Sequence, residues 1–114
     1  GFSLTQEAEF TSNGGVYADS LAGLFLESDI VCICLPLTPK TEGIISEKLL
    51  ELMRPDAILV NVSRGGVVDE VALAKLLSQG RFRAALDVFR TEPLPKVDPL
   101  RSVPLESLLL TPHV

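Results

Sequence analysis

The sequence contains few of the residues on which several protein classes depend. It has one histidine, His113, so any acid–base chemistry by an imidazole must use that residue. Lys and Arg number 10 against 15 Asp and Glu, and the net charge of −5 leaves no electrostatic footprint for nucleic acid or an anionic membrane. No apolar run approaches the roughly 20 residues that a membrane-spanning helix needs. We therefore expect neither a nucleic-acid-binding nor a membrane-embedded protein.

Cysteine is also scarce. Cys32 and Cys34 alternate within an apolar run, so on a strand both side chains would point to the same face. Neighbouring positions on one strand are poor disulfide partners, and two thiols alone do not make a metal site. We expect plain buried thiols, which weakly favours a reducing compartment.

The first residues carry no targeting signal. Residues 1–19 have neither a basic start nor a long apolar run, so we predict no signal peptide and a cytoplasmic location, with an organellar one left open. The chain begins with Gly1 rather than Met, and we therefore expect a fragment, a processed product or the ordered part of something longer.

Several catalytic signatures are missing as well. The sequence has no GxxxxGK[ST] phosphate loop, no nucleophile elbow, no glycosidase-like pair of carboxylates and no cluster of metal ligands. What is present is ordinary globular composition, with 46% apolar and 22% charged residues in 114, enough for one modest core.

Four short apolar runs alternate with helical patterns. The runs cover residues 31–35, 58–62, 84–88 and 108–111, and they are continuous, which is typical of parallel strands covered on both faces. The order predicts βαβ units in a doubly wound parallel sheet. The four prolines between residues 90 and 104 predict an irregular and functional loop.

Capping residues mark the helices. Asp19 is placed to cap a helix that ends near Ser28, and Ser46 a helix that turns Leu49, Leu50 and Met53 inward and stops at Pro55. Asp69 is placed to cap a third helix, with Leu73, Leu76 and Leu77 inward and Gly80 as its C-terminal cap.

Polar side chains follow the apolar runs at their carboxyl ends. Asn61 lies near the end of the second run and Arg64 follows it. The third run carries Asp87 and leads to Glu92, and the fourth leads to His113. Ligands of open parallel sheets bind outside the carboxyl ends of the strands, so these residues predict one site.

Each of these residues also has a plain structural interpretation. A buried Asn61 could bond the nearby backbone, whereas for Asp87 we favour a ligand or a charged partner. Arg64 could be a surface arginine at a tight turn, although the two glycines after it would let the backbone approach a ligand closely. Glu92 could be merely solvated, and His113 could be structural.

Three motifs resemble those of the D-isomer-specific 2-hydroxyacid dehydrogenases. Residues 61–73 resemble the arginine motif of that family, residues 86–93 its glutamate motif and residues 111–113 its histidine motif. Residues 28–31 and 35–41 also match, and the resemblance covers about residues 18–114. It implies a partial Rossmann-like α/β fold, with residues 18–114 as the later part of a dinucleotide-binding domain. Residues 1–17 form a separate segment that could be the tail of an earlier strand.

The resemblance implies reversible hydride transfer between a nicotinamide cofactor and a 2-oxo or 2-hydroxy acid. Arg64 would hold the substrate carboxylate and keto oxygen, His113 would exchange the proton, and Glu92 would orient the imidazole. Asp87 would face the nicotinamide. The other residues expected to line the cofactor crevice are Pro36, Thr41, Val62 and Ser63, with Arg64 and His113 beside them.

The sequence departs from the family in what it lacks. It has no G-x-G-x-x-G turn, no strand before that turn and no substrate-binding domain, so we expect the chain alone to bind cofactor weakly and its sheet to have a gap or two unpaired edges. NAD is the expected cofactor, and Ser3 at the end of an earlier strand would leave NADP open. A homodimer is expected for the parent protein. The alternatives are an NAD(H)-sensing co-repressor on the same scaffold and, more weakly, an inert fragment.

Overall fold

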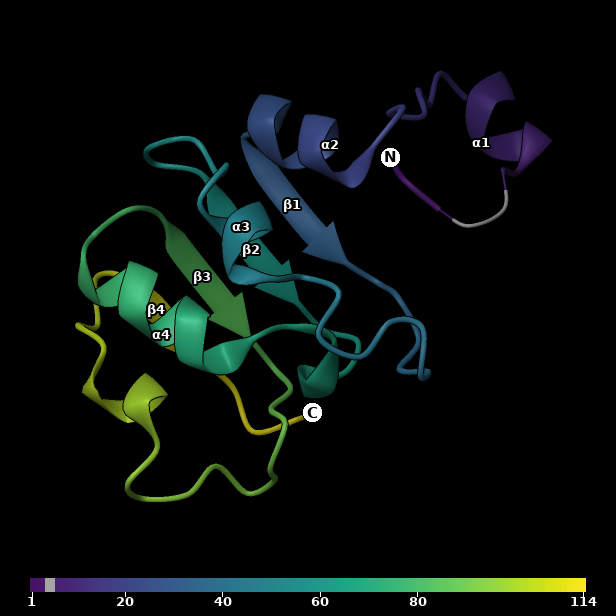
Figure 1. The fold of residues 1–114 in the computed structure, drawn as a ribbon. Coiled ribbons are helices and arrows are strands. Elements are labelled where there is room, and N and C mark those ends of the chain that lie inside the picture. Colours follow the sequence, from purple (N-terminus) through teal and green to yellow (C-terminus); the bar gives the residue numbers. More distant parts are fainter. Residues whose placement is uncertain (4–5) are drawn as a thin grey trace.

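Four parallel strands form the centre of the structure, a computed structural model that describes residues 1–3 and 6–114 (Figure 1). They are β1 (Ile30–Ile33), β2 (Ile58–Asn61), β3 (Arg83–Leu86) and β4 (Leu108–Leu110), hydrogen-bonded in chain order. Each strand begins within one residue of the start of its predicted run and ends one or two residues before the end of that run. The parallel sheet is confirmed. The four strands have no gap between them, and β1 and β4 are its edges.

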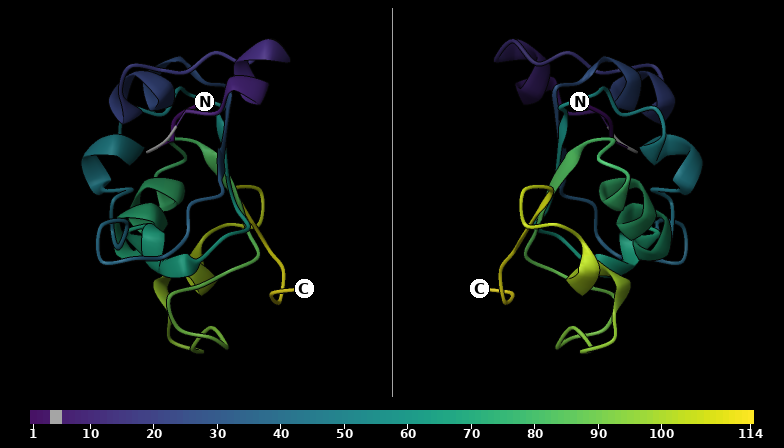
Figure 2. Two further views of the ribbon diagram at one scale, coloured as in Figure 1. Left: turned by 90° about the vertical axis from the view of Figure 1, so that its right-hand side faces the viewer. Right: turned by 90° about the vertical axis from the view of Figure 1, so that its left-hand side faces the viewer.

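Three helices cover one face of this sheet. They are α2 (Leu21–Glu27), α3 (Glu47–Leu50) and α4 (Glu70–Ser78), and the edge-on views show them together on the same side (Figure 2). Their apolar side chains and the inward residues of the strands make one core, in which Leu59, Leu73 and Leu77 are completely buried.

The helix caps follow the sequence with one exception. Ser46 and Asp69 accept backbone N–H groups from Leu49 and Ala72, as predicted. Asp19 is wrong as the first cap. Ser20 takes that position and accepts the N–H of Gly23, because the helix begins one residue later than expected. The predicted end of this helix is confirmed, since the residue after Glu27 is its C-cap.

The C-termini of the helices differ in how they end. Gly80 follows α4 with φ of 69°, and the next amide bonds back to Leu76, which confirms the glycine cap. Pro55 does not end α3, which already stops at Leu50. The chain there tightens into turns, with Met53 N–H bonded to the carbonyl of Leu50, and Met53 is still buried as expected.

The second face of the sheet is open, which contradicts the prediction that both faces are covered. Burial alternates along β1, and Ile30 and Leu109 are each 63% exposed. Cys32 and Cys34 lie on this face and are exposed, so the expectation of buried thiols is also wrong. The apolar composition of a run does not distinguish a strand that is covered on both faces from a strand that is covered on one face only.

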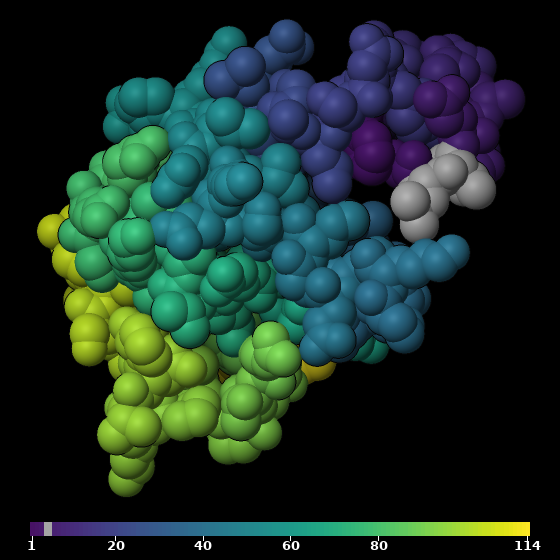
Figure 3. All heavy atoms as spheres, viewed as in Figure 1, coloured from purple at the N-terminus to yellow at the C-terminus, as the bar shows by residue number. Residues whose placement is uncertain are grey.

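Three elements were not predicted. One is α1 (Ala8–Ser12), which stands apart from the sheet with the N-terminal residues (Figures 1 and 3). The others are the 3₁₀ helices η1 (Gly65–Val67) and η2 (Pro99–Ser102), the second inside the proline-rich loop. Gly1 bonds to Val16 and Ala18 rather than to the sheet, and a boundary at residue 17 stays a prediction. No helix in the described part of the chain is both long and apolar enough to cross a membrane.

Candidate active site

The loops after β2, β3 and β4 meet at the carboxyl edge of the sheet. A cavity of about 500 Å³ lies there, and Arg64, Glu92 and His113 all line it. The three side chains that the sequence placed on separate strand ends are thus brought together. The same cavity is lined by two glycines and by apolar surface from Leu37 and Phe89.

Asn61 organises the turn that carries the arginine. It is 1% exposed, and its amide donates to the carbonyl of Arg64 while its Oδ1 accepts from the backbone and hydroxyl of Ser63. The hydrogen bonds of this buried side chain are therefore directed at the turn, as its backbone interpretation predicted. Arg64 is left exposed, with its guanidinium 2.7 Å from the carbonyl of Ser63.

Gly65 joins this turn to the glutamate loop. A Cβ on Gly65 would lie 1.9 Å from the carbonyl carbon of Phe89 and 2.2 Å from the nitrogen of Arg90. Only a residue without a side chain permits that approach. The contact places the turn that begins at Arg64 directly against the loop that leads to Glu92.

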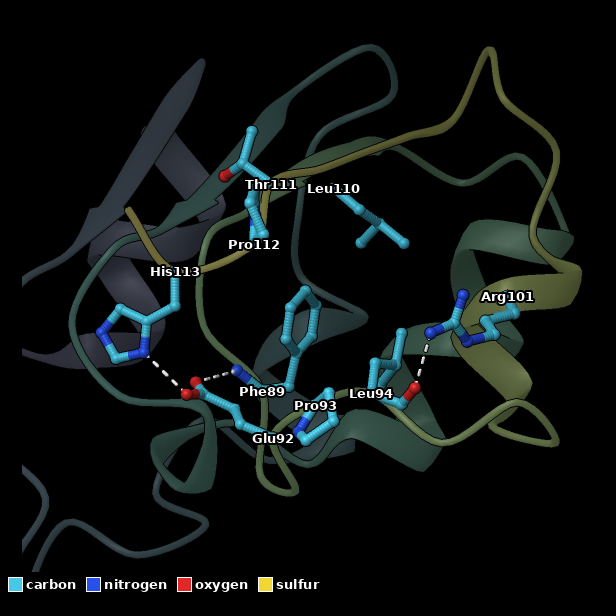
Figure 4. A pocket seen from close by; sticks show the side chains of 9 residues that line it. All are labelled: Phe89, Glu92, Pro93, Leu94, Arg101, Leu110, Thr111, Pro112 and His113. Carbon is cyan, nitrogen blue, oxygen red and sulfur yellow. Dashed lines mark hydrogen bonds and ion pairs between the residues drawn. The ribbon is translucent and has the colours of Figure 1, made fainter.

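The glutamate and the histidine form a direct pair (Figure 4). Glu92 Oε2 lies 2.7 Å from His113 Nδ1, and Glu92 Oε1 accepts the N–H of Phe89 at 3.1 Å. The hydrogen bond to His113, then the bond from Phe89, lower the pKa of Glu92, and the charge of Arg64 lowers it further. Glu92 is therefore a carboxylate at neutral pH, held in place to orient the imidazole through Nδ1 and to leave Nε2 for a reactant.

Asp87 holds the histidine loop on both sides of the imidazole. Its Oδ1 accepts the hydroxyl of Thr111 at 2.5 Å and the backbone N–H of Val114 at 3.1 Å. These bonds, that of Thr111 first, lower the pKa of Asp87. His113, between the two donors, has a φ of 60°, which is unusual for a side chain with a Cβ. The hydrogen-bond donors to the Asp87 carboxylate are a hydroxyl and an amide rather than a charged side chain, and the alternative prediction of a ligand stays a prediction.

The predicted cofactor residues divide into two groups. Val62 is 55% exposed at the end of β2, next to Ser63, and presents an apolar surface beside the arginine. Thr41 is buried instead, where it donates to the carbonyl of Pro36 at 2.6 Å and accepts the N–H of Thr38 at 2.8 Å. It therefore closes the loop after β1.

A second cavity, of about 290 Å³, is also lined by the glutamate–histidine pair (Figure 4). Phe89, Leu94 and Leu110 form its apolar wall. These residues and Thr111 were not predicted as site residues from the sequence, because their roles depend on contacts between the third and fourth strand ends. A threonine directly before the Pro-His pair was the one available signal.

Comparison with known proteins now places the chain. Residues 2–114 match the family model of the D-isomer specific 2-hydroxyacid dehydrogenase, NAD binding domain. The chain belongs to this family. Its sequence is 48% identical over 92 residues to glyoxylate/hydroxypyruvate reductase B of Pectobacterium atrosepticum, a match that covers 80% of this chain and 28% of the reductase.

Solved structures of the family have the same fold. A D-isomer specific 2-hydroxyacid dehydrogenase from Xanthobacter autotrophicus Py2, in complex with NADPH and MES, superposes with a TM-score of 0.87 at 38% identity, covering 99% of this chain and 46% of that one. D-lactate dehydrogenase from Aquifex aeolicus, complexed with NAD and lactic acid, gives 0.86 at 28% identity, with 98% and 38% covered. The chain thus spans less than half the length of these relatives.

Proposed function

We propose that this chain is the catalytic part of the cofactor domain of an oxidoreductase that interconverts 2-oxo acids and D-2-hydroxy acids. The observation that carries the proposal is the pairing of His113 with Glu92 at 2.7 Å in the cavity that Arg64 also lines. The activity belongs to a polypeptide of the length of the relatives, with residues 18–114 contributing the later part of the dinucleotide-binding domain.

The residue types fit the chemistry of a keto acid. The Arg64 guanidinium presents a rigid fork of donors that suits a carboxylate and the adjacent keto oxygen. His113 delivers a proton from its outer nitrogen to the keto oxygen during reduction and takes it back during oxidation. Glu92 accepts from the inner nitrogen, which fixes the orientation of the imidazole.

The residues at the edge of the sheet fit the nicotinamide half of NAD or NADP. A bound nicotinamide cofactor supplies the hydride. The exposed Val62 offers an apolar surface for a flat ring, with Ser63 and Arg64 beside it. Pro36 and Thr41 shape the loop along the crevice, and Asp87 lies at the histidine end. The sequence contains no glycine-rich turn for the pyrophosphate, which would have to be held elsewhere.

The substrate class is a small 2-oxo or 2-hydroxy acid. The names of the relatives, a glyoxylate/hydroxypyruvate reductase and a D-lactate dehydrogenase, support this class and give no support to the regulatory alternative. We keep a homodimer and a cytoplasmic location as proposals for the parent protein.

The test is steady-state kinetics of the full-length protein with glyoxylate, hydroxypyruvate and pyruvate in the presence of NADH or NADPH. We expect turnover with at least one acid, and a loss of about 10²–10⁴-fold in kcat for His113→Gln. Arg64→Gln should mainly raise KM, because it removes the fork that holds the carboxylate.

A matched variant separates a catalytic role from a structural one. Glu106→Gln removes an exposed carboxylate that lies outside both cavities, and it should leave kcat unchanged. Tight NADH binding with no turnover of any of the three acids would contradict the proposal and favour a cofactor sensor.

A further inference from the structure

Phe89 and Arg90 begin the glutamate loop, which leads to Glu92. The amide of Phe89 donates to Glu92 Oε1 at 3.1 Å, so the position of this backbone helps to set the position of the carboxylate that pairs with His113. Gly65 packs against the peptide between Phe89 and Arg90. Any further contact that fixes this peptide therefore also acts on the glutamate–histidine pair.

Glu70, the first residue of α4, makes such a contact. Its Oε1 accepts the backbone N–H of Arg90 at 2.9 Å, across 20 residues of sequence. Asp69 caps the same helix directly before it, and both acidic residues belong to the motif that carries Arg64. The segment that begins at the proposed substrate-binding arginine therefore leads into a helix whose first side chain holds the glutamate loop.

The carboxylate of Glu70 lies where its charge is disfavoured. The residue is partly buried, and burial raises its pKa, whereas the hydrogen bond from Arg90 acts in the opposite direction. The negative charges of Asp98 and Glu92 raise the pKa further. A fully solvated carboxylate in the first turn would interact with the helix dipole without this loss of hydration. The contact with the glutamate loop is the interaction that the partly buried position adds.

We propose that Glu70 is a positioning residue, which fixes Glu92 against His113 through the backbone of the glutamate loop. The inference rests on the proposed function. Glu70 lines a cavity of about 380 Å³, and it is not among the residues that line the cavity beside Arg64 and His113. It therefore acts on the imidazole through the loop and does not contact the reactants.

The experiment compares kcat and KM of the full-length wild type, Glu70→Ala and Glu70→Gln, with NADH or NADPH and the acid that the enzyme reduces. We expect Glu70→Ala to lower kcat about 10–100-fold and to leave KM for the acid within about twofold of wild type, because the imidazole is displaced while Arg64 still binds the carboxylate. Glu70→Gln keeps an oxygen that accepts the N–H of Arg90, and its kcat should be within about threefold of wild type.

Glu47 provides a matched control. It is the first residue of α3, as Glu70 is of α4, but its carboxylate bonds Lys75 at 2.7 Å instead of the glutamate loop. Glu47→Ala should therefore leave kcat unchanged. An equal loss of kcat in Glu47→Ala would overturn the proposal, as would a Glu70→Gln variant as impaired as Glu70→Ala. A rise in KM with no change in kcat for Glu70→Ala would also overturn it.

Hydrogen exchange at the amide of Arg90 keeps the result independent of how the alanine variant folds. Measured by nuclear magnetic resonance, this amide should be protected in the wild type and in Glu70→Gln, and should exchange at least about tenfold faster in Glu70→Ala. An unprotected Arg90 amide in the wild type would overturn the role of Glu70. Absence of turnover by a wild type whose Arg90 amide is protected would instead contradict the proposed function, so the two failures are distinguishable.

Discussion

At the scale of single residues, Gly65 sets the geometry of the site. No side chain fits between its Cα and the backbone of Phe89. We predict that Gly65→Ala destabilises the protein by about 3 kcal/mol, because the two loops must move apart to admit a methyl group. Urea denaturation measures the loss.

The adjacent glycine is the matched control for this change. A Cβ on Gly66 would meet only the methyl groups of Leu37, at 3.1 Å and 3.2 Å, and these belong to a flexible and half-exposed side chain. Gly66→Ala should therefore cost much less than the change at Gly65. Equal losses at the two positions would contradict the close approach described above.

Glu92 predicts a specific dependence of stability on pH. Its pKa in the folded protein lies below the value of about 4.3 of an unfolded chain. Its ionised form therefore stabilises the fold above that pH, and the contribution is lost as the pH falls through the folded pKa. The difference in urea midpoint between wild type and Glu92→Gln should be largest near pH 7 and shrink towards pH 3. A difference that grows on acidification would contradict this assignment.

At the scale of elements, the N-cap of α2 is open to test. Ser20 accepts the N–H of Gly23, whereas Asp19 is exposed and outside the helix. We expect Ser20→Ala to reduce the free energy of unfolding by about 1 kcal/mol and Asp19→Ala to change it by less than about 0.5 kcal/mol. The reverse order, measured by thermal or urea unfolding, would restore Asp19 as the cap.

The strands and two of the three caps could be predicted because their signals are local. A run such as residues 58–62 is apolar over the length of a strand, and Ser46 and Asp69 each precede a helical pattern. Asp19 and Ser20 are both good capping residues, so composition could not choose between them. The choice depends on where the helix begins to pack on the sheet.

The candidate residues of the site could be predicted from the sequence, but the hydrogen bonds that connect them could not. Arg64, Glu92 and His113 could be chosen from their motifs and from the rule that strand ends converge. The bonds of His113 to Glu92 and of Thr111 to Asp87 join segments that lie 21 and 24 residues apart in the sequence. Such contacts depend on the register of the sheet, which no periodicity in this sequence encodes.

At the scale of the whole molecule, cofactor affinity tests what the chain contains. The 114 residues include no glycine-rich phosphate turn, so a pyrophosphate would find no helix N-terminus built for it. We predict that this chain binds NADH with a dissociation constant well above the micromolar range, measured by fluorescence titration or calorimetry. Micromolar binding would show that the residues of the carboxyl edge hold the cofactor without that turn.

The contact between Gly65 and Phe89 also has a consequence for recombining this domain with its relatives. The backbone of the arginine turn packs directly against the backbone of the glutamate loop. The conformation of each segment therefore has to fit that of the other. A chimera with its crossover between residues 66 and 88 would draw the two surfaces from different parents. Chimeras that inherit residues 61–92 as one block should be the ones that retain a working catalytic centre.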